Sequence, residues 1–183
     1  MIITELYNGQ GLGNQLWSYV VTRTLALDKG LDFGIMSPEK FKGKEFLNLD
    51  FGKEVLGGSG PEGGPPKRLP QGILHYYDEK NTWYEKYGCD IRDFDQGLLN
   101  ISDQTKIEGY FQSENFILHR RNEIKDWLRI EAEYDCYDFS SDDICILNIR
   151  GGEYKGNHDL ILPKQYWLDA INNMLRVKKD LEF

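Results

Sequence analysis

The sequence has few cysteines, and none of them are paired at a metal-binding or redox spacing. Cys89, Cys136 and Cys145 are the only cysteines in 183 residues, and no C-x-x-C is present. A zinc ribbon and a dithiol redox motif are therefore excluded, because both need closely spaced thiols. An odd number of widely spaced cysteines is typical of reduced thiols in a cytosolic protein.

The sequence also lacks an excess of positive charge and a long hydrophobic run. Lys and Arg total 22 against 30 Asp and Glu, and the net charge of −8 argues against electrostatic binding to nucleic acid or to an anionic membrane. No apolar stretch approaches the ~20 residues of a membrane-spanning helix, and residues 1–5 do not resemble a signal peptide. We therefore expect a soluble, cytoplasmic protein without a nucleic-acid partner.

The N-terminal segment predicts the first unit of a parallel α/β sheet. Residues 2–6 have the apolar character of a short strand, and the glycine-rich residues 8–14 follow them. Residues 15–28 carry apolar side chains at helical spacing, with Asn14 as the expected N-cap, and residues 31–36 form a second candidate strand. A strand, a glycine loop, a helix and a strand in this order indicate a βαβ unit.

The remaining sequence predicts strands and helices separated by polar segments. Residues 57–70 are rich in glycine and proline and predict a flexible surface loop, and the acidic residues 131–143 predict a linker. The near-continuous apolar run at 144–149 is typical of a central parallel strand that is covered on both faces. Further strands are expected at 73–77 and 104–110, and further helices at 113–129 and 163–178.

The glycine-rich segment is the first candidate for chemistry. Gly9, Gly11 and Gly13 precede a helix N-terminus, where free backbone N–H groups and the helix dipole favour anions. Glycines also let a phosphate or a sugar approach the backbone closely. The spacing G-x-G-x-G matches neither the dinucleotide fingerprint nor the P-loop, and a purely structural turn remains the alternative.

The second candidate is the segment of residues 148–154, in which Arg150 follows the expected strand. Ligands of open α/β sheets bind at the carboxyl ends of the strands. A guanidinium group binds phosphate through two hydrogen bonds and keeps its charge, so Arg150 could neutralise a diphosphate leaving group. The alternative is an arginine paired with Glu153 or with another acid at the surface, and the two interpretations are equally supported.

The third candidate, residues 107–114, places a glycine and polar residues at the end of a strand. Ser113 is a plausible helix N-cap, so a packed turn with an aromatic anchor is favoured over a catalytic array. The three histidines share no metal-ligand spacing, and no G-x-S-x-G motif is present, which leaves little support for a metal centre or a covalent hydrolase.

In this order, the three segments resemble family 11 glycosyltransferases, the α-1,2-fucosyltransferases, and more distantly other inverting fucosyltransferases. Residues 9–16, G-Q-G-L-G-N-Q-L, resemble the family segment G-G-L-G-N-Q-M/L. Residues 107–114, I-E-G-Y-F-Q-S-E, match the segment L-x-G-Y-F-Q-S-E almost throughout. Residues 148–154, N-I-R-G-G-E-Y, stand where the family has H-x-R-R-G-D-Y. The resemblance spans essentially the whole chain.

The resemblance implies a GT-B arrangement, in which two Rossmann-like domains enclose a cleft. It also implies transfer of fucose from GDP-fucose to the 2-hydroxyl of galactose in a glycan, with inversion and without a cofactor or an essential metal. The implied partners are a nucleotide sugar and a glycan acceptor such as a surface polysaccharide. Peripheral association with a membrane is left open.

Site residues follow from the resemblance position by position. Arg150 and Glu153 are implied as catalytic residues, with Arg150 binding the donor diphosphate. Candidates for the general base are Glu108, Glu114 and Glu153. The implied donor-binding residues are Gly11, Gly13, Asn14, Asn148 and Arg150, and the implied acceptor-cleft residues are Tyr110, Gln112 and Glu114.

Mapped onto the chain, the resemblance implies an α/β fold with two parts. Residues 1–139 are expected to form the N-terminal, acceptor-side Rossmann-like domain, including the loop at 57–70. Residues 140–183 are expected to form only the beginning of the donor-binding domain. Because that domain supplies most of the donor pocket in a GT-B enzyme, the alternative is a truncated or inactive fragment that binds nucleotide sugar or glycan without catalysis.

Overall fold

The computed structural model describes residues 1–56, 69–80, 82–84, 89–91, 93–134, 141–149 and 161–183. The chain divides into two compact units, Met1–Tyr134 and Asp135–Phe183, and the division falls within the expected linker. Most of the expected loop at 57–70 lies outside the described residues.

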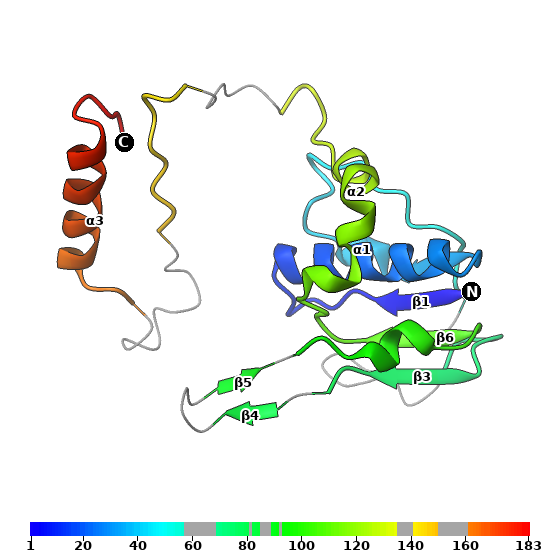
Figure 1. The fold of residues 1–183 in the computed structure, drawn as a ribbon. Helices are drawn as coiled ribbons and strands as arrows, with labels where there is room; N and C mark the ends of the chain where they lie inside the picture. The colour runs from blue at the N-terminus through cyan, green and yellow to red at the C-terminus, as the bar shows by residue number, and fades with distance from the viewer. Residues whose placement is uncertain (57–68, 81, 85–88, 92, 135–140, 150–160) are drawn as a thin grey trace. The chain divides into compact units, whose positions relative to one another are not determined.

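The first unit is built on a four-stranded sheet in which all paired strands are parallel. The strands are β1 (Ile2–Glu5), β2 (Phe33–Met36), β3 (His75–Asp78) and β6 (Thr105–Glu108), in the order β2-β1-β6-β3 (Figure 1). With three α-helices in the described part of the chain, the fold is α/β and consistent with a Rossmann-like domain. The predicted α/β class with a parallel sheet is confirmed, and each predicted strand of this sheet is present with shifted ends.

Helix α1 (Leu12–Asp28) connects β1 to β2 and covers one face of the sheet (Figure 1). The prediction that Asn14 caps this helix is wrong: the N-cap is Gly11, and Asn14 lies in the first turn. Glycine has no Cβ to restrict its extended backbone, so it serves as an N-cap without a side-chain hydrogen bond. The helix ends at Asp28, and the left-handed φ of 64° at Gly30 permits the hydrogen bond from the Leu31 N–H to the Ala26 carbonyl.

The two faces of the sheet carry different side chains because residues alternate along each strand. On the face toward α1, Ile2 and Ile107 pack with Val21, Leu25 and Leu98 in the main hydrophobic core. On the opposite face, a smaller cluster contains Ile3, Met36 and Ile73.

The expected helix at 113–129 is broken into three short pieces. These are the 3-10 helices η3 (Glu114–Phe116) and η4 (Leu118–Arg120), followed by α2 (Arg121–Trp127). Phe116 is buried in the main core, and Ile117 takes a non-helical φ of −131° directly after it. Tertiary packing of the aromatic side chain therefore overrides the local helical pattern.

The first unit also contains shorter elements. The strands β4 (Thr82–Tyr84) and β5 (Cys89–Ile91) pair in an antiparallel manner between β3 and β6 in the chain. Two further 3-10 helices are η1 (Pro38–Lys40) and η2 (Gln96–Asn100). Across the described ranges of both units, no helix combines the length and the hydrophobicity needed to cross a bilayer.

The second unit is described at residues 141–149 and 161–183, and it contradicts one prediction. The apolar run at 144–149 is not a central strand: only Ile144 forms a single bridge, to Glu182, and Ile146 and Ile149 are 65% and 63% exposed. A strand needs neighbouring strands to pair with, and the described part of this unit contains none.

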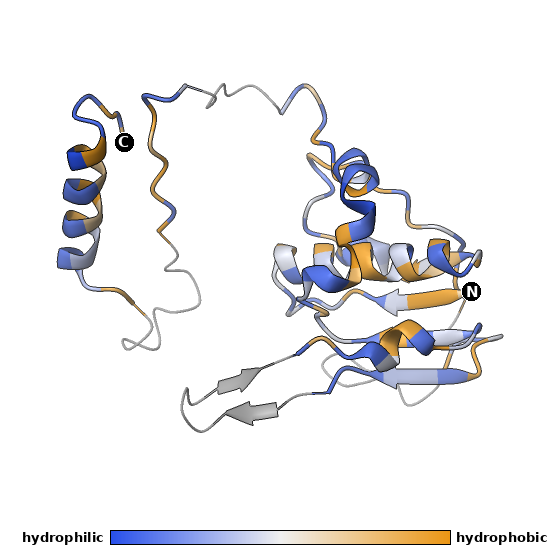
Figure 2. Ribbon diagram, viewed as in Figure 1, coloured by the Kyte–Doolittle hydropathy of each residue, from blue (hydrophilic) through white to orange (hydrophobic). Residues whose placement is uncertain are grey.

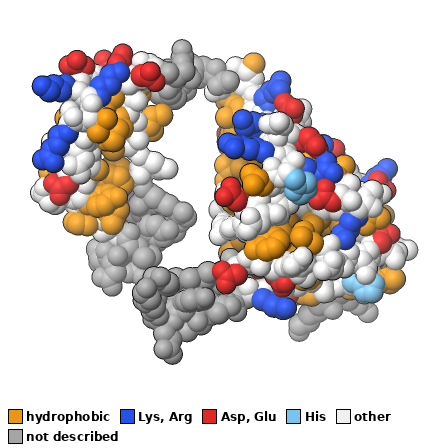
Figure 3. Space-filling view, in the orientation of Figure 1, with side chains coloured by type: hydrophobic (Ala, Val, Ile, Leu, Met, Phe, Trp, Pro, Cys, Tyr) orange, Lys and Arg blue, Asp and Glu red, His pale blue; other side chains and the backbone are white. Residues whose placement is uncertain are grey.

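The C-terminal helix of the second unit confirms the prediction for 163–178. Helix α3 (Lys164–Val177) is amphipathic, with hydrophobic residues along one side and polar residues along the other (Figure 2). The space-filling view shows the same division between apolar and charged side chains along α3 (Figure 3). No residue of α3 is buried.

Candidate functional site

A cleft of about 430 Å³ opens where β1, β6 and β3 end. This is the carboxyl edge of the parallel sheet, the usual ligand-binding edge of α/β folds. Both the glycine-rich segment and the segment 107–114 contribute to its wall. The cleft is lined by Thr4, Glu5, Tyr7, Gly9, Gln10, Asp78, Glu79, Glu108, Gly109 and Tyr110.

Direct hydrogen bonds join these two segments, which lie far apart in the sequence. The Gln112 Nε2 atom donates to Oδ1 of Asn14 at 2.8 Å, across 98 positions of the chain. The Ser18 hydroxyl of α1 lies 2.9 Å from the Gly109 carbonyl oxygen. The start of α1 and the turn after β6 therefore form one continuous surface beside the cleft.

The glycines of the first segment are not required by the fold. None of Gly9, Gly11 and Gly13 has a positive φ, and a Cβ built on any of them would meet no atom within 4 Å. Gly9 lines the cleft, and the backbone of Gly11 and Gly13 is exposed. Because these three residues have no side chains, a ligand can approach the backbone of this segment closely.

The three expected acceptor residues do not share one cavity. Tyr110 lines the cleft, whereas Gln112 and Glu114 line a separate hollow together with Trp17 of α1. Phe111 lies between them with a left-handed φ of 49° and a side chain buried in the core. This turn therefore separates Tyr110 and Gln112 into different cavities.

The other expected site residues belong to the second unit. Asn148 is exposed in the extended segment before the expected motif arginine. Arg150 and Glu153 lie outside the described residues.

Glu79 is a cleft residue that the sequence reasoning missed. Its carboxylate accepts hydrogen bonds from the backbone N–H groups of Tyr110 and Phe111, at 2.8 and 2.9 Å. Its own N–H donates to the Glu108 carbonyl at 2.8 Å. Glu79 therefore holds the turn after β6 in place. An acidic residue directly after a strand is too common to have indicated this role.

A buried ion pair between Lys106 and Glu5 lies beside the cleft residue Glu108, and the sequence reasoning missed this pair as well. The Lys106 Nζ atom is 2.7 Å from Glu5 Oε2, and these side chains are 0% and 2% exposed. Nζ is also 3.9 Å from Glu108 Oε2, the atom that accepts a hydrogen bond from the Tyr76 hydroxyl at 2.8 Å. The sequence Thr-Lys-Ile-Glu of β6 suggests an exposed lysine, since strand polar residues usually face water.

The hydroxyl groups of Tyr7 and Tyr76 both lie near the Glu108 carboxylate. Burial raises the pKa of Tyr76 well above its ordinary range, and the hydrogen bond to Glu108 and its charge raise it further. Burial also raises the pKa of Tyr7, followed by the negative charges of Glu108 and Glu5. Both phenols therefore stay protonated. Around this site and elsewhere in the described chain, no three His, Cys, Asp or Glu residues are placed to hold a metal ion.

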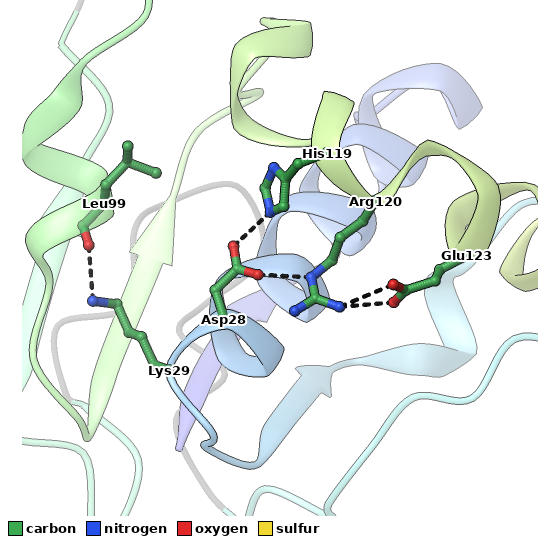
Figure 4. Close-up of polar contacts among 6 residues, drawn as sticks. All are labelled: Asp28, Lys29, Leu99, His119, Arg120 and Glu123. Carbon is green, nitrogen blue, oxygen red and sulfur yellow. Dashed lines mark hydrogen bonds and ion pairs between the residues drawn. The ribbon is translucent and has the colours of Figure 1, made fainter.

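Two basic residues of η4, His119 and Arg120, lie outside the cleft and form ion pairs (Figure 4). Arg120 pairs with Asp28 at 2.7 Å and with Glu123 at 2.8 Å, and His119 lies 2.9 Å from Asp28. These pairs raise the pKa of Arg120 and connect the end of α1 to α2. These ion pairs explain the positions of His119 and Arg120, and no bound ligand is needed to explain them.

Comparisons of the chain with models of known protein families, with curated proteins and with solved structures give no match. The functional argument therefore depends on the motif segments and on the chemistry of the cleft.

Proposed function

We propose that the protein is a sugar transferase of the α-1,2-fucosyltransferase type with a GT-B arrangement. In this reaction, fucose passes from GDP-fucose to the 2-hydroxyl of a galactose in a glycan, with inversion. One observation carries the proposal: the segments 9–16 and 107–114, which carry the family resemblance, meet at one cleft. That cleft lies at the sheet edge where α/β enzymes bind their substrates.

The chemistry of the cleft suits a sugar acceptor. Its lining includes the acidic residues Asp78 and Glu108, and carboxylate oxygens are acceptors for the hydrogen bonds of sugar hydroxyls. The Tyr110 side chain adds an aromatic surface at the same wall. In the proposed complex, the acceptor galactose lies in this cleft with its reacting hydroxyl at a carboxylate.

Glu108 is the general base that the geometry favours. It lies in the cleft, whereas Glu114 lines the separate hollow. As the acceptor hydroxyl loses its proton to this carboxylate, its oxygen forms a bond to C1 of fucose. The bond between C1 and the diphosphate oxygen breaks, and its electron pair leaves with GDP. The proton transfer contributes to the rate because it prevents positive charge from building up on the acceptor oxygen as that oxygen bonds to C1.

Arg150 is the residue proposed to stabilise the leaving group. The segment resemblance implies that Arg150 and Asn148 bind the donor and that Glu153 is a further catalytic residue. A guanidinium that forms two hydrogen bonds with the diphosphate stabilises the negative charge that develops on GDP. Positioning and charge stabilisation are the main requirements of a transfer through an oxocarbenium-like state.

Calorimetric titration of the 183-residue chain with GDP and with GDP-fucose tests this proposal. We expect both ligands to bind, and Arg150→Ala to weaken binding at least about tenfold, because the diphosphate loses its charged partner. The control is Arg129→Ala, since Arg129 is an exposed arginine that pairs with Asp126. Donor binding that Arg150→Ala leaves unchanged would contradict the proposed role of Arg150.

A glycan-binding protein without transferase activity is the second candidate. It is supported by the composition of the cleft, whose described lining residues all belong to the first unit. For this candidate, galactose-terminated oligosaccharides bind while GDP and GDP-fucose do not. The same titrations, extended to these oligosaccharides, separate the two functions.

A further inference from the structure

We propose that the hollow beside the cleft is a second saccharide subsite, which holds an inner sugar of the acceptor glycan while the terminal galactose lies in the cleft. The hollow has a volume of about 490 Å³ and is lined by residues of α1, of α2 and of the chain between β6 and α2. The place of the galactose rests on the proposed function. The capacity of the hollow to bind a sugar rests on its own residues.

Helix periodicity brings the walls of the hollow together. Trp17 follows Asn14 by three positions, so both lie on one side of α1. Asn14 accepts the hydrogen bond from Gln112, which lines the hollow together with Trp17. On α2, Arg121 and Ile124 have the same spacing and line the same hollow. The hollow is therefore assembled from positions that the fold holds in place.

One part of the hollow is aromatic and apolar. Trp17 is half-buried and packs against the main core, which limits the movement of its indole ring. Ile117 and Ile124 add apolar side chains to the same lining. A sugar ring carries C–H groups on its faces, and these groups pack favourably against the electron-rich face of an aromatic ring. Trp17 therefore offers an aromatic surface to one sugar ring.

The rest of the lining carries hydrogen-bonding groups of three kinds. These are the amide of Gln112, the carboxylate of Glu114 and the guanidinium of Arg121, all on exposed residues. Within the described part of the chain, neither Glu114 nor Arg121 forms an ion pair or a side-chain hydrogen bond. Every other arginine described in the first unit is paired with a carboxylate. Both charged groups are thus available to a ligand.

The charges and the apolar surface together favour a neutral ligand with many hydroxyl groups. Glu114 and Arg121 contribute formal charges of opposite sign, so the lining does not concentrate small anions or small cations. An apolar ligand would remove both groups from water without giving them hydrogen bonds, which is unfavourable. Sugar hydroxyls donate to a carboxylate and accept from a guanidinium, while the ring covers Trp17. A saccharide therefore satisfies every part of the lining.

The turn after β6 connects this hollow to the cleft. Tyr110 lines the cleft and Gln112 lines the hollow. Two residues of chain span at most about 7 Å, so the two cavities approach each other closely at this turn. A disaccharide can cover this distance, with its terminal unit beside Tyr110 and its inner unit beside Gln112. The preferred acceptor is therefore an oligosaccharide rather than free galactose.

NMR of the tryptophan indole N–H groups shows which cavity a sugar occupies. The probes are methyl β-galactoside, lactose, N-acetyllactosamine and lacto-N-biose, each added to the 183-residue chain. The chain has four tryptophans, and the variant Trp17→Phe assigns the Trp17 signal. We expect at least one disaccharide to shift the Trp17 signal and methyl β-galactoside to leave it in place, because the single sugar fills only the cleft.

Trp127 provides the reference signal within the same molecule. Its ring lies 4.4 Å from the Arg23 guanidinium carbon, and it lines neither the cleft nor the hollow. The Trp127 signal should therefore stay in place with every probe. A Trp17 signal that none of the three disaccharides moves overturns the proposal.

Calorimetric titration measures what the charged groups contribute. We expect a disaccharide to bind at least about tenfold more tightly than methyl β-galactoside, and Glu114→Ala and Arg121→Ala each to remove most of this advantage. Both residues are exposed, so both variants should fold. Lys125→Ala is the control, because Lys125 is an exposed cation of the same helix that does not line the hollow. A disaccharide advantage that both variants retain overturns the proposal.

Assays of fucose transfer distinguish failure of the subsite from failure of the proposed function. If disaccharides move the Trp17 signal but receive no fucose from GDP-fucose, the proposed function fails and the subsite stands. If methyl β-galactoside and the disaccharides receive fucose with equal KM and the Trp17 signal stays in place, the proposed function stands and the subsite is wrong. Absence of binding by all four probes contradicts both.

Discussion

Two residues of the turn after β6, Gly109 and Phe111, have conformations or surroundings that few side chains tolerate. Phe111 combines a φ of 49° with a side chain that is 1% exposed and packs edge-to-face on Phe116, with ring centroids 6.5 Å apart. A left-handed backbone at such a residue costs of order 1–3 kcal/mol and persists only where the surroundings hold it. Here the core holds the ring, and Glu79 holds the backbone. The turn is therefore strained beside the cleft, where Tyr110 enters it.

At Gly109, a methyl group has no room. A Cβ would lie 2.4 Å from the Cβ of Glu79. We expect Gly109→Ala to lower the free energy of unfolding by about 1–3 kcal/mol, because overpacking must displace the residue that holds the turn. Urea denaturation measures this change.

The matched control is Gly9→Ala, at another glycine that lines the same cleft. A Cβ on Gly9 would meet no atom within 4 Å, and its φ is not positive. Its stability should change by no more than about 0.5 kcal/mol. Equal effects of the two substitutions would show that the contact with Glu79 does not constrain Gly109.

At the scale of elements, helix α1 is attached to the following chain by a buried polar side chain. Gln15 is fully buried, its Nε2 atom donates to the Lys40 carbonyl, and its Oε1 atom accepts from the Lys42 N–H, each at 2.9 Å. Gln15 belongs to the segment that carries the family resemblance. In this structure it connects α1 to the chain after β2, so the segment has a structural role in addition to its position beside the cleft.

The variant Gln15→Leu tests whether the hydrogen bonds of Gln15, rather than the size of its buried side chain, hold α1 to the chain after β2. Gln15→Leu keeps the size of the side chain and leaves the Lys40 carbonyl and the Lys42 N–H without their partners. We expect a loss of roughly 2–4 kcal/mol of unfolding free energy, because each buried unpaired group costs about 1–3 kcal/mol. Thermal unfolding followed by circular dichroism measures the loss.

Gln71→Leu makes the same chemical change at an exposed position and serves as the reference. It should leave the midpoint of unfolding nearly unchanged. If Gln15→Leu is as stable as this reference, the two hydrogen bonds do not hold α1.

At the scale of the whole molecule, the hydrophobic core belongs to the first unit. Every buried hydrophobic residue among those described lies between Ile2 and Phe116. In the second unit, the described residues 141–149 and 161–183 include none that is buried. Since burial of apolar surface is the main favourable term in folding, stability is concentrated in Met1–Tyr134.

Two fragments, divided between Tyr134 and Asp135, test whether the folding stability of the chain is concentrated in the first unit. A fragment of residues 1–134 should unfold cooperatively, with a midpoint within a few degrees of the whole chain. A fragment of residues 135–183 should show no cooperative unfolding, since the described part of it has no core. Calorimetry on each fragment gives the answer, and a 1–134 fragment without a cooperative transition would contradict the assignment of the core.

The sequence could predict elements whose signal is local. Strand β1, helix α1 and strand β2 follow from apolar periodicity and from a glycine at each end of the helix, so the βαβ unit was predictable. The helix at 113–129 failed because burial of Phe116 breaks a locally helical pattern. The apolar run at 144–149 failed as a strand because pairing depends on neighbours, which no local pattern reports.

The sequence by itself determined the α/β class, the two segments that border the cleft and the residue types available for its chemistry. Only the tertiary structure decided that Asn14 meets Gln112, that Tyr110 and Gln112 line different cavities, and that Lys106 is buried. The physical reason is that periodicity records which face of an element is apolar. Which charged groups meet depends on strand order and register, and these are set by contacts between residues far apart in the chain.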